Sequence, residues 1–174
     1  MQRRSFLRGT AAIGGGLIAG CTQFADFGET YRLWFIRIHN GTTRQRSVDL
    51  RVFRDSDLIF EREYTNISSF QATEEQDATF AAMDSARLVE GEWELKAGSY
   101  SVEYRFSSDD SYHRVTISEI EDLESEDVGM NIQLLGRSHS QPRVGFKLYQ
   151  FTSDDQASKF VENVSQENVT ETSG

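Results

Sequence analysis

Apolar and polar residues alternate with a period of two over most of the chain between residues 31 and 151. The alternation is cleanest in the segment SYSVEYRFS, where one side of an extended chain carries Tyr100, Val102, Tyr104 and Phe106. Glu103 and Arg105 fall on the opposite side. A period of two is typical of a β-strand with one face buried and one face in water. We therefore predict a strand here, with its tyrosines inward and its charged residues outward.

Six further segments have short apolar runs bounded by turn-forming Gly, Asp, Ser and Asn residues. They are YRLWFIRIHN (31–40), SVDLRVFRD (47–55), LIFEREY (58–64), YHRVTIS (112–118), VGMNIQLL (128–135) and RVGFKLYQF (143–151). In the segment 31–40, the alternation puts three residues on one face, Trp34, Ile36 and Ile38, and puts Leu33 and Phe35 on the other. In the segment 58–64, the alternation predicts that three side chains point inward, those of Leu58, Phe60 and Tyr64. These strands predict an all-β fold, an antiparallel β-sandwich of about seven or eight strands.

Two regions depart from this pattern. Residues 66–92 are compatible with a strand and a long loop, or with one short helix. In the polar segment 152–174, Ser153 and Gln156 have the spacing of a capping box. Four apolar residues would share one face of a helix that follows: Ala157, Phe160, Val161 and Val164. We predict a short helix there, with disorder over the last ten residues. The sandwich domain is thus expected to span residues 31–151, followed by a partly disordered polar tail.

The first 21 residues do not show the period of two. Residues 3–21 read RRSFLRGTAAIGGGLIAGC. A basic start with Arg3 and Arg4 precedes a short apolar run of small residues that ends at Cys21, the one cysteine of the chain. This order is typical of an export signal. The run has about half the ~20 residues that a membrane-spanning helix needs. We predict a cleaved signal peptide over residues 1–20 and a tether over 21–30.

The details of this segment carry a family resemblance. RRSFLR resembles the twin-arginine export motif, in which Arg3 and Arg4 are read by the translocase and Phe6 and Leu7 complete the pattern. LIAGC resembles a lipobox, whose cysteine is lipidated and becomes the mature N-terminus. Together they resemble the twin-arginine lipoprotein signals of surface proteins from halophilic archaea. The resemblance implies an extracytoplasmic protein that is anchored to the outer face of the cell membrane by lipid at Cys21.

The net charge of the chain limits the classes of partner that it is expected to bind. The formal net charge is −10, and loss of the signal would remove three of the 18 basic residues and none of the 28 acidic ones, leaving about −13. Such a charge disfavours nucleic acid and anionic headgroups as partners. Only three basic residues are lysines. An acid-rich, lysine-poor composition favours adaptation to concentrated salt, with an ordinary acidic protein of biased codon usage as the alternative.

Asparagines are unevenly placed. Four of the five stand in N-x-[ST] sequons, which is more than the Ser and Thr content predicts by chance. The four predicted glycosylation sites are Asn40, Asn66, Asn163 and Asn168. Turn chemistry is the alternative explanation, because Asn beside Ser or Thr also favours loops.

No arrangement of catalytic residues stands out in the sequence. His39, His113 and His139 have no metal-ligand spacing relative to one another. Glu92 and Glu94 would share one side of a strand, but 28 acidic residues produce such pairs by chance. We predict a protein that is not an enzyme, with no metal site and no cofactor. Most of the 12 phenylalanines are assigned to the core, with an aromatic ligand-binding platform as the alternative.

A second resemblance concerns the domain itself. AGSYSVEY resembles the Gly-x-Tyr-x-Val hairpin entry of immunoglobulin-like domains, with Gly98 in the turn and Tyr100 at the start of the strand. The wider layout is similar to the immunoglobulin-like domains of haloarchaeal surface lipoproteins. The resemblance implies a non-enzymatic, lipid-anchored cell-surface protein of the archaeal envelope, a binding or structural module whose partner is a surface protein or a glycan. The alternative is a ligand- or glycan-binding accessory module of a transporter or surface enzyme, which outward aromatics in one concave patch would favour.

Overall fold

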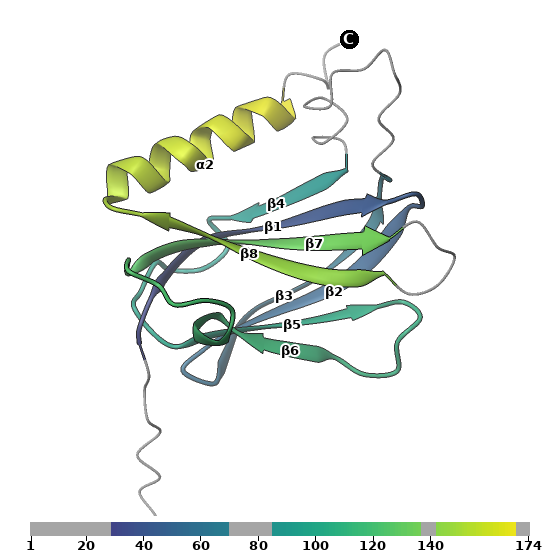
Figure 1. Ribbon diagram of the computed structural model, residues 1–174, viewed down its shortest axis with the longest axis horizontal. Helices are drawn as coiled ribbons and strands as arrows, with labels where there is room; N and C mark the ends of the chain where they lie inside the picture. Colours follow the sequence, from purple (N-terminus) through teal and green to yellow (C-terminus); the bar gives the residue numbers. More distant parts are fainter. Residues whose placement is uncertain (1–28, 70–84, 137–141, 170–174) are drawn as a thin grey trace, which may run out of the picture.

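The computed structural model describes residues 29–69, 85–136 and 142–169. Figure 1 shows two layers of strands with one helix lying on one of them. The strands are β1 (Arg32–Thr42), β2 (Arg46–Arg54), β3 (Asp57–Ile67), β4 (Ala86–Glu90), β5 (Tyr100–Phe106), β6 (His113–Thr116), β7 (Asp127–Gly136) and β8 (Arg143–Phe151). A 3-10 turn, η1 (Ile117–Glu119), follows β6, and the helix is α2 (Asp154–Val169).

The strands form two sheets of four. The helix-covered sheet has the order β4-β1-β7-β8, and the open sheet has the order β3-β2-β5-β6. Buried apolar side chains from both sheets form one core between them, among them Ile36, Leu50, Val102 and Ile132. The rings of Tyr104 in the open sheet and Phe146 in the helix-covered sheet lie 5.9 Å apart across this core. The predicted β-sandwich is therefore confirmed.

One strand pair departs from the antiparallel arrangement that the sequence predicts. β1 runs parallel to β7, from Arg32 opposite Asp127 to Thr42 opposite Gly136, while the other pairings between these strands are antiparallel. After β1 the chain crosses to the open sheet instead of turning back as a hairpin. Parallel neighbours cannot be joined by a tight hairpin and need a long crossover connection. Here that connection includes all four strands of the open sheet, which lie between β1 and β7 in the chain.

A bulge in β1 changes which residues share a face. Leu33 pairs with Val128 and Phe35 pairs with Gly129, so Trp34 is an extra residue on its strand. Leu33 consequently joins Ile36 and Ile38 in the core between the sheets, whereas Trp34 and Phe35 both lie on the side of α2. The grouping of Trp34 with Ile36 and Ile38 was wrong for this reason.

A second bulge, in β3, corrects another predicted face. Val52 pairs with Phe60 and Phe53 pairs with Leu58, so Ile59 is the extra residue. Phe60 is buried as predicted, but Leu58 is 51% exposed. The extra residue turns Leu58 to the outer face, because a shift of one residue reverses the direction of a side chain in a strand.

Strand β5 follows the sequence pattern closely. Tyr100 and Val102 are fully buried, and Phe106 is nearly so. Tyr104 is half-buried and packs against the core, and Glu103 and Arg105 form ion pairs on the outer face. The predicted register of this strand is confirmed.

Helix α2 begins where the sequence predicts a cap. The Ser153 hydroxyl accepts a hydrogen bond from the amide of Gln156 at 3.3 Å, and Gln156 Oε1 accepts one from the amide of Thr152 at 2.8 Å. Asp154 and Asp155 lie in the first turn, where a carboxylate is stabilised by the helix dipole. The helix is longer than expected: it continues to Val169, so the disorder predicted from residue 165 is wrong for residues 165–169, and 170–174 lie outside the described residues.

The middle of the chain, which the sequence left ambiguous, contributes strand β4 at the edge of the helix-covered sheet, and residues 70–84 lie outside the described part. Within the described residues, no helix has the length and apolar character required to cross a membrane.

Candidate functional site

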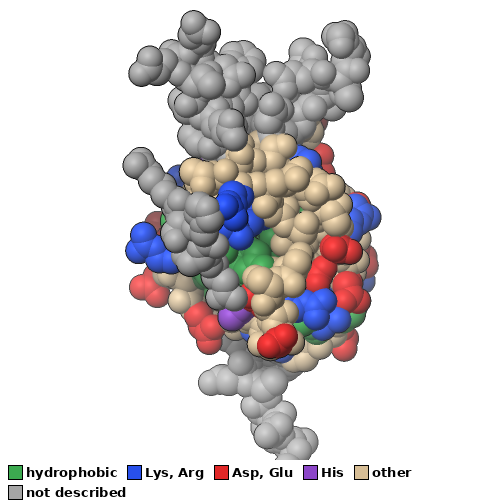
Figure 2. All heavy atoms as spheres, turned by 90° about the vertical axis from the view of Figure 1, so that its right-hand side faces the viewer, with side chains coloured by type: hydrophobic (Ala, Val, Ile, Leu, Met, Phe, Trp, Pro, Cys, Tyr) green, Lys and Arg blue, Asp and Glu red, His purple; other side chains and the backbone are tan. Residues whose placement is uncertain are grey.

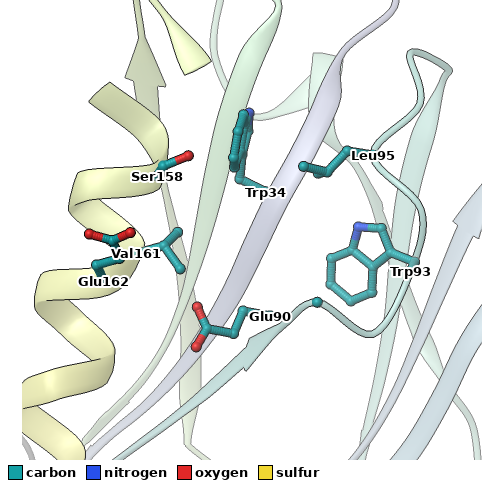
Figure 3. Close-up of a pocket in the computed structure, with 8 residues that line it drawn as sticks. Trp34, Glu90, Trp93, Leu95, Ser158, Val161 and Glu162 are labelled. Atoms are coloured by element: carbon teal, nitrogen blue, oxygen red, sulfur yellow. The ribbon is translucent and has the colours of Figure 1, made fainter. Parts of the chain in front are cut away.

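An open groove of about 500 Å³ lies between α2 and the connection that follows β4. Its lining residues are Trp34, Glu90, Gly91, Trp93, Leu95, Ser158, Val161 and Glu162. Figure 3 shows the helix residues along one side and Trp34, Leu95 and Trp93 along the other. The groove contains both tryptophans of the chain and a leucine that is 41% exposed.

The bulge in β1 positions Trp34. Its indole N–H donates to Asp127 Oδ1 at 2.8 Å, and Asp127 Oδ2 accepts a hydrogen bond from Arg32 at 2.6 Å. The same guanidinium donates to Asp154 at 2.6 Å, which ties the start of α2 to the start of β1. Hydrogen bonds to Asp154 and Asp127 raise the pKa of Arg32, and the bond from Arg32 lowers the pKa of Asp154. One charged network therefore orients both the tryptophan and the helix beside it.

Trp93 is held from the other side. Gly91 turns the chain after β4 with a φ of 65°, a conformation that glycine adopts without strain. The Trp93 indole N–H donates to the Leu33 carbonyl at 2.8 Å, and its ring packs edge-on against Phe60 at 5.6 Å. With this N–H used inside the domain, Trp93 presents ring surface rather than a hydrogen-bond donor to the groove.

The helix wall of the groove rests on an aromatic cluster. Phe160 lies 5.4 Å from Phe35, 5.0 Å from Tyr149 and 5.4 Å from Phe151, measured between ring centroids. This packing fixes the rotation of α2 so that Val161, one residue further, faces the groove.

Glu90, at the end of β4, is the most constrained acid in the groove. Its Oε1 accepts a hydrogen bond from the Ser165 hydroxyl at 2.5 Å, while its buried Oε2 has no hydrogen-bond partner in the structure. Glu162 contributes a second carboxylate from α2. A ligand with a hydrogen-bond donor would satisfy Glu90 Oε2, and a ligand with a positive charge would stabilise the carboxylate by electrostatic attraction.

A second hollow, of about 330 Å³, is polar and is lined by Asp49, Glu63, Arg105, Phe106, Ser107 and Asp109. Arg105 donates two hydrogen bonds to Asp49, at 2.9 and 2.6 Å, and lies over the ring of Tyr112. Figure 2 shows acidic and basic side chains intermixed on one end of the molecule around a small hydrophobic area. The charges lining this second hollow are thus partly neutralised within the domain, and the tryptophan groove is the better candidate site.

The N-terminal features predicted from the sequence lie outside the described residues. Arg3, Arg4, Phe6, Leu7 and Cys21 all precede residue 29. The export motif and the lipidation site therefore stay predictions.

Asn40, the first predicted glycosylation site, is fully buried. Its Nδ2 donates to the carbonyls of Arg44, Ile67 and Ser68 at 2.7–3.0 Å, and its Oδ1 accepts from the amide and hydroxyl of Thr42. A glycan on Nδ2 would replace these bonds and would have no room beside them. The prediction at Asn40 is wrong for the folded domain, where this amide closes the turn between β1 and β2.

The other sequons are not alike. Asn66 is exposed near the end of β3, in the left-handed region with a φ of 57°. Asn163 is exposed on α2, but the hydroxyl of its sequon partner Ser165 is engaged with Glu90 and the Val161 carbonyl. The side chain of Asn168 lies outside the described part. Asn66 and Asn163 stay predicted sites.

The histidines and the paired acids are dispersed. His39 is on the outer face of the helix-covered sheet, His113 lies 3.2 Å from Asp109 at the edge of the open sheet, and His139 is outside the described residues. Glu92 and Glu94 are not in a strand; they pair with Arg62 at 2.8 Å and Lys96 at 2.7 Å, respectively. Among the residues that the structure describes, no three His, Cys, Asp or Glu side chains are grouped to hold a metal ion.

Nothing in the sequence linked the two tryptophans, because they are far apart in the chain and meet only through the pairing of β1 with β4. Comparison with known proteins adds no relative: the chain matches no family model and no curated protein. Functional inference therefore rests on the groove and on the sequence itself.

Proposed function

We propose that this chain is a lipid-anchored, extracytoplasmic binding module without catalytic activity, and that the two-tryptophan groove is its binding site. The observation that carries the proposal is the groove itself: two half-buried indoles and a partly exposed leucine surround an open hollow of about 500 Å³. Ligand sites are concave, mostly apolar and carry a few fixed polar groups, and this hollow has that character.

The anchored location is supported by the sequence alone. The twin-arginine and lipobox resemblances of residues 1–21 favour export and lipidation at Cys21. Nine residues separate Cys21 from Tyr31, and at ~3.6 Å per residue they span at most about 30 Å. The proposed binding groove would therefore work close to the outer face of the membrane of an archaeal cell adapted to salt.

The immunoglobulin-like part of the proposal concerns architecture and not strand order. In the constant-type immunoglobulin arrangement the first two strands share a sheet. Here β1 and β2 belong to different sheets. Many cell-surface domains share the sandwich architecture without that topology, and we propose that this domain is one of them.

The groove favours the accessory-module alternative over a purely structural role. Outward aromatics in one concave patch favour that alternative, and Trp34 and Trp93 line one hollow. A module that only supports the envelope has no need of such a site. We therefore propose a ligand-binding accessory module at the cell surface as the specific function.

The location is tested by fractionation. Replacement of Cys21→Ser should move the exported protein from the membrane to the medium, and Arg3→Lys with Arg4→Lys should retain the precursor in the cytoplasm. A Cys21→Ser protein that stays in the membrane fraction would contradict lipid anchoring.

The groove is tested by crosslinking in native envelopes at high salt, followed by affinity capture of the products. Leu95→Arg places a long, positively charged side chain in the groove and should abolish the crosslinked product. Leu58→Arg is the matched control, because Leu58 is also an exposed leucine but lies away from the groove. Equal crosslinking in both variants would mean that the groove is not the binding surface.

A further inference from the structure

We propose that the groove binds a small quaternary ammonium compound, held by the tryptophan faces and the two glutamates. This rests on the proposed function, in which the groove is the binding site, and it adds the chemical class of the ligand. Three properties of the lining support it: the direction of the indoles, the sign of the charge and the shortage of hydrogen-bond donors.

The indoles offer their ring surface and not their polar edge. Both N–H groups are used inside the domain, by Trp34 toward Asp127 and by Trp93 toward the Leu33 carbonyl. The face of an indole carries negative electrostatic potential, and it attracts a cation more strongly than the other aromatic rings do. Quaternary ammonium groups suit such faces because they combine positive charge with apolar methyl groups.

The charge in the groove has one sign. Glu90 and Glu162 line it, and none of its eight lining residues is a lysine or an arginine. The chain as a whole is acidic, with a formal net charge of −10. The buried Glu90 Oε2 has no hydrogen-bond partner, so a positive charge nearby would stabilise the carboxylate. An anionic ligand would meet repulsion from both glutamates.

A neutral sugar fits the groove less well. Sugar hydroxyl groups both donate and accept, and a site for them must supply donors as well as acceptors. With the indole N–H groups occupied, the Ser158 hydroxyl is the one side-chain donor left among the lining residues. A quaternary ammonium group donates no hydrogen bond and requires none, so this lining satisfies it. The volume of about 500 Å³ lies in the range of small-molecule sites.

The two tryptophans make the test direct, because they are the only ones in the chain and both line the groove. Intrinsic fluorescence of the full chain in detergent is followed while choline chloride replaces KCl at constant ionic strength. The matched probe is 3,3-dimethylbutan-1-ol, which has the shape of choline with a carbon atom in place of the charged nitrogen. Glucose serves as the sugar probe.

We expect a saturable fluorescence change with choline and about tenfold weaker binding of the neutral alcohol. Glu162→Gln should weaken choline binding by about two- to fivefold, as for an exposed charge, and leave the alcohol unaffected. Glu162 is exposed on α2, so the substitution should leave the fold intact. Glu121→Gln, an exposed acid outside the groove, is the control that should change neither affinity.

Three results would overturn the inference. Equal affinity for choline and the alcohol would show an apolar groove without selection for charge. Saturable binding of glucose with none of choline would assign the groove to sugars. No response to choline at all would exclude this ligand class, while the crosslinking of Leu95→Arg would still decide separately whether the groove is a binding surface.

Discussion

The two outer faces of this sandwich differ in the side chains that they carry and in whether a further layer covers them. The helix-covered sheet carries Phe35, Tyr149 and Phe151 on its outer face, and Phe160 of α2 covers them. The open sheet instead carries paired charges, with Asp49 bonded to Arg105 and other arginines and glutamates beside them. An apolar outer face requires a further layer, whereas a face of paired charges can stay in water.

The arginines of the open sheet also protect aromatic surface. Arg51 and Arg105 lie over the ring of Tyr112 at 4.0 and 4.7 Å, and Arg114 lies over Phe53 at 4.7 Å. A guanidinium stacks on a ring while its N–H groups keep their partners. The two-tryptophan groove therefore lies where the domain adds a layer, at the margin of α2, and not on the face whose charges are paired.

The largest expected effect comes from the covered face. Phe35→Ala removes a fully buried ring that contacts Tyr149, Phe151 and Phe160, and we expect a loss of about 3–5 kcal/mol in unfolding free energy. Phe53→Ala on the open face should cost less than about 1 kcal/mol. Urea denaturation at high salt measures both, and equal losses would remove the distinction between the faces.

Close packing on the covered face predicts a smaller effect from a single methyl group. A Cβ at Gly129 would lie 2.2 Å from Phe35 Cε1, so Gly129→Ala must displace the ring, and we expect a loss of about 1–3 kcal/mol. Gly145→Ala, on the neighbouring strand β8 and with its nearest contact at 3.4 Å, should stay within about 0.5 kcal/mol. A neutral Gly129→Ala variant would show that the cluster under α2 is loosely packed.

The covered sheet should also give the domain a pH response. Burial, together with nearby Arg37, lowers the pKa of His39 below its ordinary 6.5. The unfolded chain then binds a proton at a higher pH than the folded domain does. The resulting stability is present above pH 6.5 and is lost as the pH falls from 6.5 through the folded pKa.

Chemical denaturation at pH 7.5 and 5.5 measures this response. His39→Gln should reduce the difference between the two pH values, because the substituted side chain does not titrate. An unchanged difference in this variant would assign the pH response to other groups.

The smallest effect is expected on the open face. The coupling between Arg105 and Asp49, measured by a double-mutant cycle, should be weaker than any aromatic effect above because both side chains are partly exposed to water. It should fall further between ~0.1 and ~2 M KCl, as the Debye length drops from ~10 Å to below ~3 Å. A coupling that is large and independent of salt would mean that this ion pair is shielded from solvent.

The sequence determined the strands other than β4, and local periodicity is the reason. In β2 and β5, the alternation of apolar and polar residues predicts which side chains are buried. It was sufficient for five core residues: Val48, Leu50, Val52, Tyr100 and Val102. The cap of α2 at Ser153 was equally local. These features depend on neighbours within a few positions, and a linear pattern contains that information.

Tertiary structure alone decided the bulges, the parallel pair and the groove. The bulge at Trp34 is visible only in the pairing of β1 with β7, and it places Trp34 and Phe35 on the same side of the sheet. The burial of Asn40 depends on carbonyls at Ile67 and Ser68, far along the chain. Trp34 and Trp93 line one groove because β1 pairs with β4 and α2 lies beside them. Each of these results from contacts between distant segments, which a periodic pattern of single residues does not encode.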